Sequence, residues 1–399
     1  MAERRPIWSV PSLHREEELD RERRVTWLEL FFDLFFVVAI AALSHDFAHE
    51  LTWEGAGEFV LKFLPVWWIW IGATFYNERF ESFGLENRLF AFLLFVPVVG
   101  LAVAAEDGLG DDFALFAGSY VLGRLIITAL WLRATYHVRE FRPTGGRFVA
   151  GFSVALVLSS TSILATGTAR YVLFGLALAI DVTTPIATAR HQARLPRFST
   201  SKLPERFGLF TIIVLGETVV AVVTALRDVA DVTPLLLLDA VLGVAVGFLL
   251  WWLYFDFVAR RSPKPGIWWR LSWSYLHVPL VMSVVTVGAG MTNILGAEGV
   301  LGRPARITMG AATGIALVSL GLLESTLLAR DDEPTHLTVS PAIKFATGLG
   351  AVGVAILPIA EASLLLAVEI LLLGVSAFYG AWVWFHQPIG AASAVSHQG

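Results

Sequence analysis

Ionisable side chains inside long apolar segments are the residues of this sequence that could do chemistry. A charged group at the centre of a membrane helix costs about 2.5–3.5 kcal/mol on insertion scales, so such a group needs a functional or a pairing role. Our candidates for a proton, ion or substrate site lie well inside apolar segments: Asp33, Arg124, Asp181, Glu217 and His277. The cytoplasmic mouth of this site is expected to hold three residues near the ends of such segments: Glu29, Glu205 and Arg206.

Glu217, in the sequence LGETVV, is the strongest candidate for a proton carrier. It lies near the middle of its apolar segment, where loss of hydration disfavours the charged form of a carboxyl. His277 could share proton transfer, because histidine changes its charge near neutral pH. The alternative is structural: Arg124 pairs with one carboxylate, Asp181 or Asp33, and the other groups form hydrogen bonds between helices.

Metal and cofactor chemistry has little support in the sequence. His45 and His49 are spaced i, i+4 and form only a weak metal candidate, because a third ligand would have to be an acid. HExxH, G-x-S-x-G, Walker and dinucleotide-binding glycine motifs are missing, so no catalytic residue is assigned and no cofactor is expected. The chain contains no cysteine, which excludes disulfides, thiolate ligands and cysteine nucleophiles.

The composition indicates the kind of element that carries these residues. Of the 399 residues, 56% are hydrophobic and 16% are charged, and the mean hydropathy is +0.68. A soluble chain carries about 25% charged residues. The apolar excess predicts an all-α, polytopic bundle in a lipid bilayer. The net charge of −5 gives no broad basic surface for nucleic acid.

Twelve segments are long and apolar enough to span a membrane. They cover residues 28–48, 58–77, 88–105, 113–132, 147–166, 169–187, 207–226, 235–257, 271–292, 307–329, 341–358 and 361–385. The first 26 residues are strongly charged and lack the apolar core of a cleavable signal peptide, so the first span should be retained. The Gly310-x-x-x-Gly314 spacing permits close packing of two helices.

A weak internal similarity predicts two six-span halves in parallel orientation, as in some secondary transporters. Arg88 and Pro97 match Arg270 and Pro279 at an offset of 182 residues. The expected organisation is a charged cytoplasmic segment (1–26), a first half (27–190), a basic cytoplasmic linker (191–206), a second half (207–385) and a short cytoplasmic tail (386–399).

Two stretches resemble the bacterial low temperature requirement A family. They are VTWLELFFDLFFVVAIAALSH, from Val25 to His45, and LPERFGLFTIIVLGETVVAV, from Leu203 to Val222. The resemblance implies a multi-pass inner-membrane protein linked to growth in the cold, and it supplies no molecular activity. The family's motif residues correspond here to Glu29, Asp33, His45, Glu205, Arg206, Glu217 and His277. Lys202 departs from the family, in which histidine is frequent at that position, so a role of that histidine does not transfer.

Two classes of function fit these observations. The first is a proton- or cation-coupled secondary transporter that handles an unknown small molecule or ion. Twelve spans, membrane acids and the lack of a soluble catalytic domain favour it. The alternative is a membrane enzyme or sensor that acts on lipid or envelope components, with Glu205 and Arg206 contacting a headgroup or phosphate. The oligomeric state stays open.

We predict that both termini are cytoplasmic and that the loop 106–112 lies outside. With this orientation, 22 of the 29 Lys and Arg residues fall in cytoplasmic segments and 4 in outer segments, as the positive-inside rule requires. Alkaline phosphatase fused within 106–112 should be active, and green fluorescent protein fused at the C-terminus should fluoresce. An inactive phosphatase at 106–112, with fluorescence from the same position, would contradict the orientation.

Overall fold

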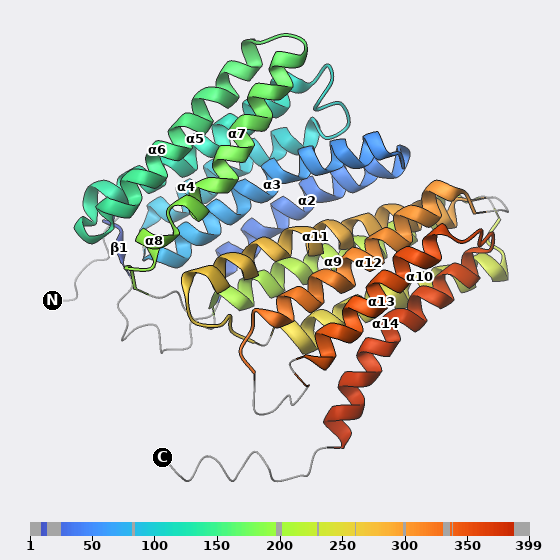
Figure 1. The fold of residues 1–399 in the computed structure, drawn as a ribbon. Coiled ribbons are helices and arrows are strands. Elements are labelled where there is room, and N and C mark those ends of the chain that lie inside the picture. Colours follow the sequence, from blue (N-terminus) through green and yellow to red (C-terminus); the bar gives the residue numbers. More distant parts are fainter. Residues whose placement is uncertain are drawn as a thin grey trace, which may run out of the picture. The chain divides into compact units, whose positions relative to one another are not determined.

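The structure is a computed structural model, drawn in Figure 1. It describes residues 9–13, 25–81, 84–196, 202–229, 231–259, 261–297, 301–329, 336 and 338–386. Its contacts divide the chain into two compact units, which we treat separately. The first unit comprises Met1–Asp46, Trp53–Phe210 and Gly266–Trp268, and the second comprises Phe47–Thr52, Thr211–Pro265 and Trp269–Gly399. The expected tail 386–399 lies almost wholly outside the described residues.

Twelve helices of the described chain are long and apolar enough to cross a membrane, which confirms the predicted all-α bundle. They are α2 (Trp27–His49), α3 (Trp53–Arg79), α4 (Leu85–Val103), α5 (Phe113–His137), α6 (Arg142–Leu164), α7 (Thr168–Ala187), α9 (Lys202–Asp228), α10 (Pro234–Tyr254), α11 (Ile267–Leu295), α12 (Arg303–Ser325), α13 (Val339–Ile356) and α14 (Ala362–Phe385). Each coincides with one predicted segment, because the membrane thickness sets the length of a span.

Four short elements and a π-turn were not predicted from the sequence. The strands β1 (Ser12–Leu13) and β2 (Phe80–Glu81) pair antiparallel. The 3₁₀ turn η1 (Arg139–Phe141) precedes α6, and α8 (Ala189–Gln192) follows α7. The π-turn η2 (Phe255–Ala259) extends α10. Apolar periodicity carries no signal for elements of two to five residues, so hydropathy alone could not find them.

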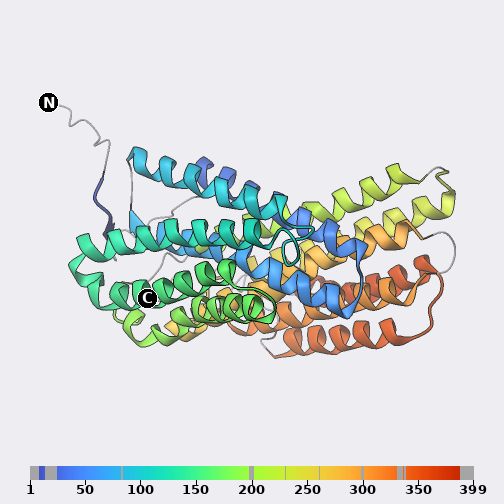
Figure 2. The same ribbon diagram turned by 90° about the horizontal axis from the view of Figure 1, so that it is seen from above.

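In the first unit, α4, α5, α6 and α7 pack one after another, and α3 contacts α5 and α7. Figure 2 shows these helices side by side along their lengths. α3 is the most enclosed of the twelve helices, because 72% of the residues in its apolar stretch are buried. Its position makes α3 the element against which the polar residues of the first unit are arranged.

In the second unit, α12 packs closely on α13, and α14 packs on α10 and α13. A Cβ atom added to Gly314 of α12 would lie 2.6 Å from Cγ2 of Val352 and 2.7 Å from the carbonyl oxygen of Gly348. Such distances are shorter than real carbon contacts, so the two backbones approach each other only because this position has no side chain. The close packing expected from the Gly310–Gly314 spacing is therefore confirmed.

We predict that Gly314→Ala destabilises the protein by about 1–3 kcal/mol, because the added methyl group overpacks this helix contact. Gly353 of α13 is the matched control, since nothing lies within 4 Å of a Cβ added there. Gly353→Ala should leave stability unchanged or raise it slightly. Unfolding of the purified variants in detergent measures both effects. Equal stability of the two variants would contradict the close contact.

Candidate functional site

Glu29 begins the polar site at the first turn of α2. Its Oε2 accepts hydrogen bonds from the amide and the hydroxyl of Thr26, at 2.9 and 3.0 Å, and Thr26 Oγ1 accepts from the Glu29 amide at 3.3 Å. This reciprocal arrangement is a capping box, which satisfies amides that the helix leaves free. The other oxygen, Oε1, lies 2.8 Å from Nζ of Lys202 on α9. Glu29 therefore caps one helix and holds a second.

Asp33 lies one turn further into α2 and is completely buried. Its Oδ1 accepts a hydrogen bond from the indole nitrogen of Trp70 at 2.7 Å and lies 3.3 Å from Nη2 of Arg206. Nη1 of Arg206 lies 3.5 Å from Oε1 of Glu29, so one guanidinium serves two carboxylates. Oδ2 of Asp33 has no hydrogen-bond partner among the described residues.

Trp70 ties this cluster to α9 as well as to α2. Its ring lies 5.0 Å from that of Phe207 and 4.2 Å from that of Phe210, centroid to centroid. These contacts fix the direction in which the indole N–H points. We call Glu29, Asp33, Trp70, Lys202 and Arg206 the α2–α3–α9 cluster.

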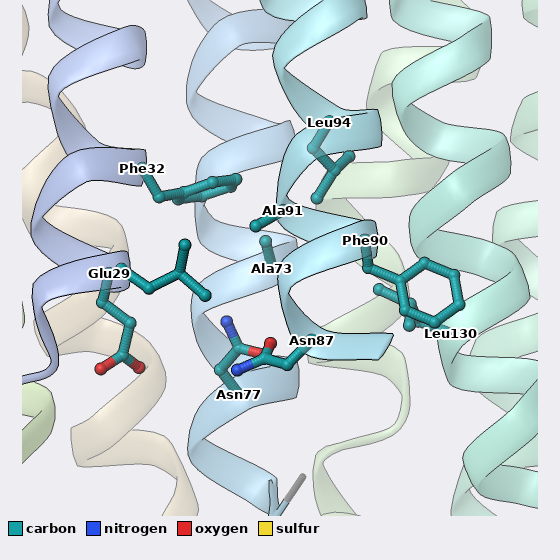
Figure 3. A pocket seen from close by; sticks show the side chains of 10 residues that line it. Glu29, Phe32, Ala73, Asn77, Asn87, Phe90, Ala91, Leu94 and Leu130 are labelled. Atoms are coloured by element: carbon teal, nitrogen blue, oxygen red, sulfur yellow. The ribbon is translucent and has the colours of Figure 1, made fainter. Parts of the chain in front are cut away.

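A small pocket lies beside this cluster and shares Glu29 with it (Figure 3). Side chains of α2, α3, α4 and α5 line it: Leu28, Glu29, Phe32, Ala73, Asn77, Asn87, Phe90, Ala91, Leu94 and Leu130. The amides of Asn77 and Asn87 point toward each other at one end, and Phe32 and Leu94 lie at the other. The pocket therefore offers hydrogen-bonding groups at one end and an apolar wall at the other.

Arg124 and Asp181 form a second polar group in the first unit. Arg124 Nε and Nη2 donate to the two oxygens of Asp181 at 2.8 and 2.6 Å, and the hydroxyl of Tyr120 donates to Asp181 Oδ2 at 2.5 Å. The guanidinium also lies 4.4 Å from the ring centre of Phe152. The prediction that a membrane carboxylate neutralises Arg124 is confirmed, and Asp181 is the partner. The alternative partner, Asp33, belongs to the other group.

α3 has these two polar groups on different faces. Trp70 donates to Asp33, whereas a Cβ added to Gly72 would lie 3.2 Å from Nη1 of Arg124. Residues two positions apart on a helix point about 200° apart. The sequence candidates Asp33 and Arg124 thus belong to one unit without sharing a contact site.

Comparison with known proteins assigns the chain to a family. The sequence model of the family described as "Bacterial low temperature requirement A protein (LtrA)" matches residues 24–383. The chain belongs to the LtrA family. A relative, the protein RA0937 of Rhizobium meliloti (strain 1021), is 28% identical over 311 residues, which are 73% of this chain and 73% of the relative. The two stretches on which the sequence resemblance rested include the α2 and α9 members of the α2–α3–α9 cluster, except Lys202.

In the second unit of this LtrA chain, His277 is completely buried on α11. Its Nδ1 donates to the carbonyl oxygen of Trp273 at 2.7 Å, since a carbonyl can only accept. Nε2 of the neutral ring then accepts from the hydroxyl of Tyr254, 3.2 Å away. Glu217 on α9 is half-buried, and no hydrogen bond or ion pair links it to another described residue. It does not join His277 in a common hydrogen bond.

The cytoplasmic-mouth residues and the metal candidate of this LtrA chain lie as follows. Glu205 is exposed, whereas Arg206 is buried in the α2–α3–α9 cluster. His45 and His49 are both exposed. Asp46, an acid that a metal site there would need, lies 2.5 Å from Nζ of Lys62 instead. In the described part of the chain, no group of three or more His, Cys, Asp or Glu could hold a metal ion.

Sequence reasoning missed several partners in the membrane region. Trp70 was not singled out from the sequence, although an indole deep in a span usually has a hydrogen-bond acceptor nearby. Lys202 was noted for its departure from the family and not as a partner of Glu29. Asn77 and Asn87 carry no charge and lie near the ends of predicted spans, so their types and positions did not indicate a site. Glu369 of α14 was overlooked although it interrupts an apolar span.

We predict that Arg124→Ala destabilises this LtrA protein by about 3–5 kcal/mol, because it leaves Asp181 buried without its counter-charge. The double variant Arg124→Ala/Asp181→Asn should lose clearly less than the sum of the two single variants. The pair Arg124→Ala/Asp33→Asn is the control and should be additive. Unfolding in detergent measures all of these. Additivity for the Asp181 pair would mean that another group holds Arg124.

Proposed function

We propose that this protein is a proton- or cation-coupled secondary transporter of the bacterial cytoplasmic membrane. The α2–α3–α9 cluster is its coupling site and the adjoining pocket is part of the solute path. The observation that carries the proposal is the state of Asp33. This carboxyl is completely buried, shares Arg206 with Glu29, and keeps Oδ2 without a hydrogen-bond partner among the described residues.

A proton and Arg206 compete for Asp33 in this mechanism. When a proton binds to Oδ2, Asp33 becomes neutral and its attraction for the guanidinium falls. Arg206 then keeps Glu29 as its one remaining counter-charge. When the proton leaves, Arg206 regains two carboxylates. Because Arg206 and Lys202 lie on α9 while Glu29 and Asp33 lie on α2, protonation changes how strongly the two helices are held together.

The pocket supplies a place where a solute would sense this change. Glu29 belongs to both the pocket and the cluster, so a ligand that engages Glu29 also alters the charge that Arg206 meets. The side-chain amides of Asn77 and Asn87 supply uncharged hydrogen-bond donors and acceptors. The apolar wall at the other end of the pocket can contact an apolar part of the solute. The lining has the chemistry that a small solute with one polar end would need.

The alternative, an enzyme or sensor for lipid headgroups, receives less support. It assigns headgroup contact to Glu205 and Arg206 as a pair. Arg206 is 2% exposed and engaged with two carboxylates, so it does not present a cation to a headgroup phosphate. Glu205 is exposed but carries the wrong charge for a phosphate.

The cellular setting is part of the same proposal. The predominance of Lys and Arg in alternate loops supports cytoplasmic termini and an inner-membrane location. We also propose that loss of this transport impairs growth in the cold, the property from which the family takes its name.

We predict that Asp33→Asn lowers coupled transport at least about tenfold, the effect of about 1.4 kcal/mol at one step. Proteoliposomes loaded with pyranine report internal pH while Na⁺, K⁺, tetraphenylphosphonium and single amino acids are added outside in turn. Wild-type protein should move protons in response to at least one of these probes, and Asp33→Asn should respond at least about tenfold more slowly.

Glu205→Gln is the matched control, because it removes an exposed carboxyl from the same end of α9. It should transport like the wild type. Loss of the response in Glu205→Gln with retention in Asp33→Asn would favour the headgroup alternative. A wild-type protein that moves no protons or cations with any probe would refute transport.

A further inference from the structure

Glu369 is a buried carboxyl that none of the preceding arguments uses. It is the eighth residue of α14 and is 0% exposed. A Cβ added to Gly310 of α12 would lie 3.2 Å from its Oε1, so the carboxyl lies against a bare stretch of helix backbone. The hydroxyl of Thr313 faces it without reaching hydrogen-bond geometry. Neither oxygen of Glu369 has a hydrogen-bond partner among the described residues.

Glu324, on α12 of the same unit, shows what a buried carboxylate needs here. Its exposed fraction is 1%, close to that of Glu369. Its Oε2 accepts hydrogen bonds from Nζ of Lys344 and from the hydroxyl of Ser340, both at 2.8 Å. Its Oε1 lies 3.5 Å from Nη1 of Arg261. Two cations and a hydroxyl thus stabilise one ionised group.

The cations on the helices around Glu369 are already engaged. Arg306 of α12 lies one turn before Gly310, and its Nε and Nη1 donate to the carbonyl oxygens of Ala355 and Ile359, both at 3.1 Å. Arg306 immediately precedes the predicted span 307–329, and in the structure it is a buried part of α12. On α13, Lys344 belongs to Glu324. Neither cation lies within ion-pair distance of Glu369 in the described structure.

The remaining ionisable groups on the packed helices do not offer a counter-charge either. On α10, Asp239 accepts a 2.5 Å hydrogen bond from Ser363, and the next ionisable residue along α10 is Tyr254. On α14 itself the other ionisable side chain is that of Tyr379. At the outer end of α12, Arg303 stands seven residues before Gly310, about 10 Å along the helix axis.

We propose that Glu369 is a proton-binding site and that its carboxyl is neutral in the folded protein at pH 7. Its ligand is a single proton, held on a carboxyl oxygen between α12 and α14. At neutral pH an ordinary glutamate is ionised with a bias of roughly 500-fold. Burial of a carboxylate that has neither a hydrogen bond nor a cation disfavours the ionised form by more than this bias, so the carboxyl keeps its proton.

Infrared spectroscopy of the purified protein in lipid at pH 7 tests the site. A protonated carboxyl has a C=O stretching band that an ionised carboxylate lacks. The difference spectrum between wild type and Glu369→Gln should show the loss of one carboxylic-acid band. Loss of carboxylate bands instead would overturn the proposal, because it would mean that Glu369 is ionised.

Glu324→Gln is the matched control, since it removes an equally buried carboxyl that has counter-charges. It should remove carboxylate bands and leave the carboxylic-acid band in place. Should Glu369→Gln fail to fold, Glu369→Asp keeps the test open, because it should shift the acid band in position and not abolish it. The proton at Glu369 does not depend on transport: a protein inactive in proteoliposomes would still show the band.

Discussion

The low polarity of the membrane interior is the constraint on which the rest of the structure depends. Moving an ion the size of a carboxylate or ammonium from water to such a medium costs of order 20 kcal/mol in the idealised limit. A charge inside the bilayer therefore needs an opposite charge or several hydrogen-bond partners close by, or it must be given up. The buried cations Lys62, Arg124, Arg206 and Lys344 each have a carboxylate oxygen within 4 Å. Each of these pairs joins two different helices within one unit.

The same constraint explains why the fold could be predicted from the sequence. A span must satisfy its own backbone and must be about 20 residues long, so apolar segments of that length are nearly all the information needed. Two pairs of predicted segments have very short connections, and each pair forms two separate helices. Segments 147–166 and 169–187 are α6 and α7, and segments 341–358 and 361–385 are α13 and α14. The charge-based orientation and the parallel duplication are properties that helix count and length do not test.

Partner choice within the membrane could be predicted only in part. Asp33 and Asp181 were equal candidates for Arg124, because all three lie at similar depths in the membrane. The sequence indicates the depth of a residue but not where its helix lies around the bundle. The intervening helix α3 decides between them by having Trp70 and Gly72 on different faces. Glu29 shows a second limit. Its Thr26-x-x-Glu pattern predicts a capping box, yet the same carboxyl also holds Lys202, which lies far along the chain.

Three buried carboxyls meet the constraint to different degrees, as their hydrogen bonds and ion pairs show. Asp181 receives two guanidinium bonds and a tyrosine hydroxyl, so removing its charge would leave Arg124 unpaired. Glu369 has no cation within reach among the described residues, so ionising it would leave a buried negative charge without compensation. Asp33 lies between these cases, with one oxygen bonded and a guanidinium that has Glu29 as a second carboxylate. Ionised Asp33 and Glu29 together balance Arg206 and Lys202, whereas protonated Asp33 leaves both cations with Glu29 alone. A residue that couples proton binding to movement must reach both protonation states, and the partial pairing of Asp33, between the extremes of Asp181 and Glu369, is the reason that the proposed mechanism places the proton there.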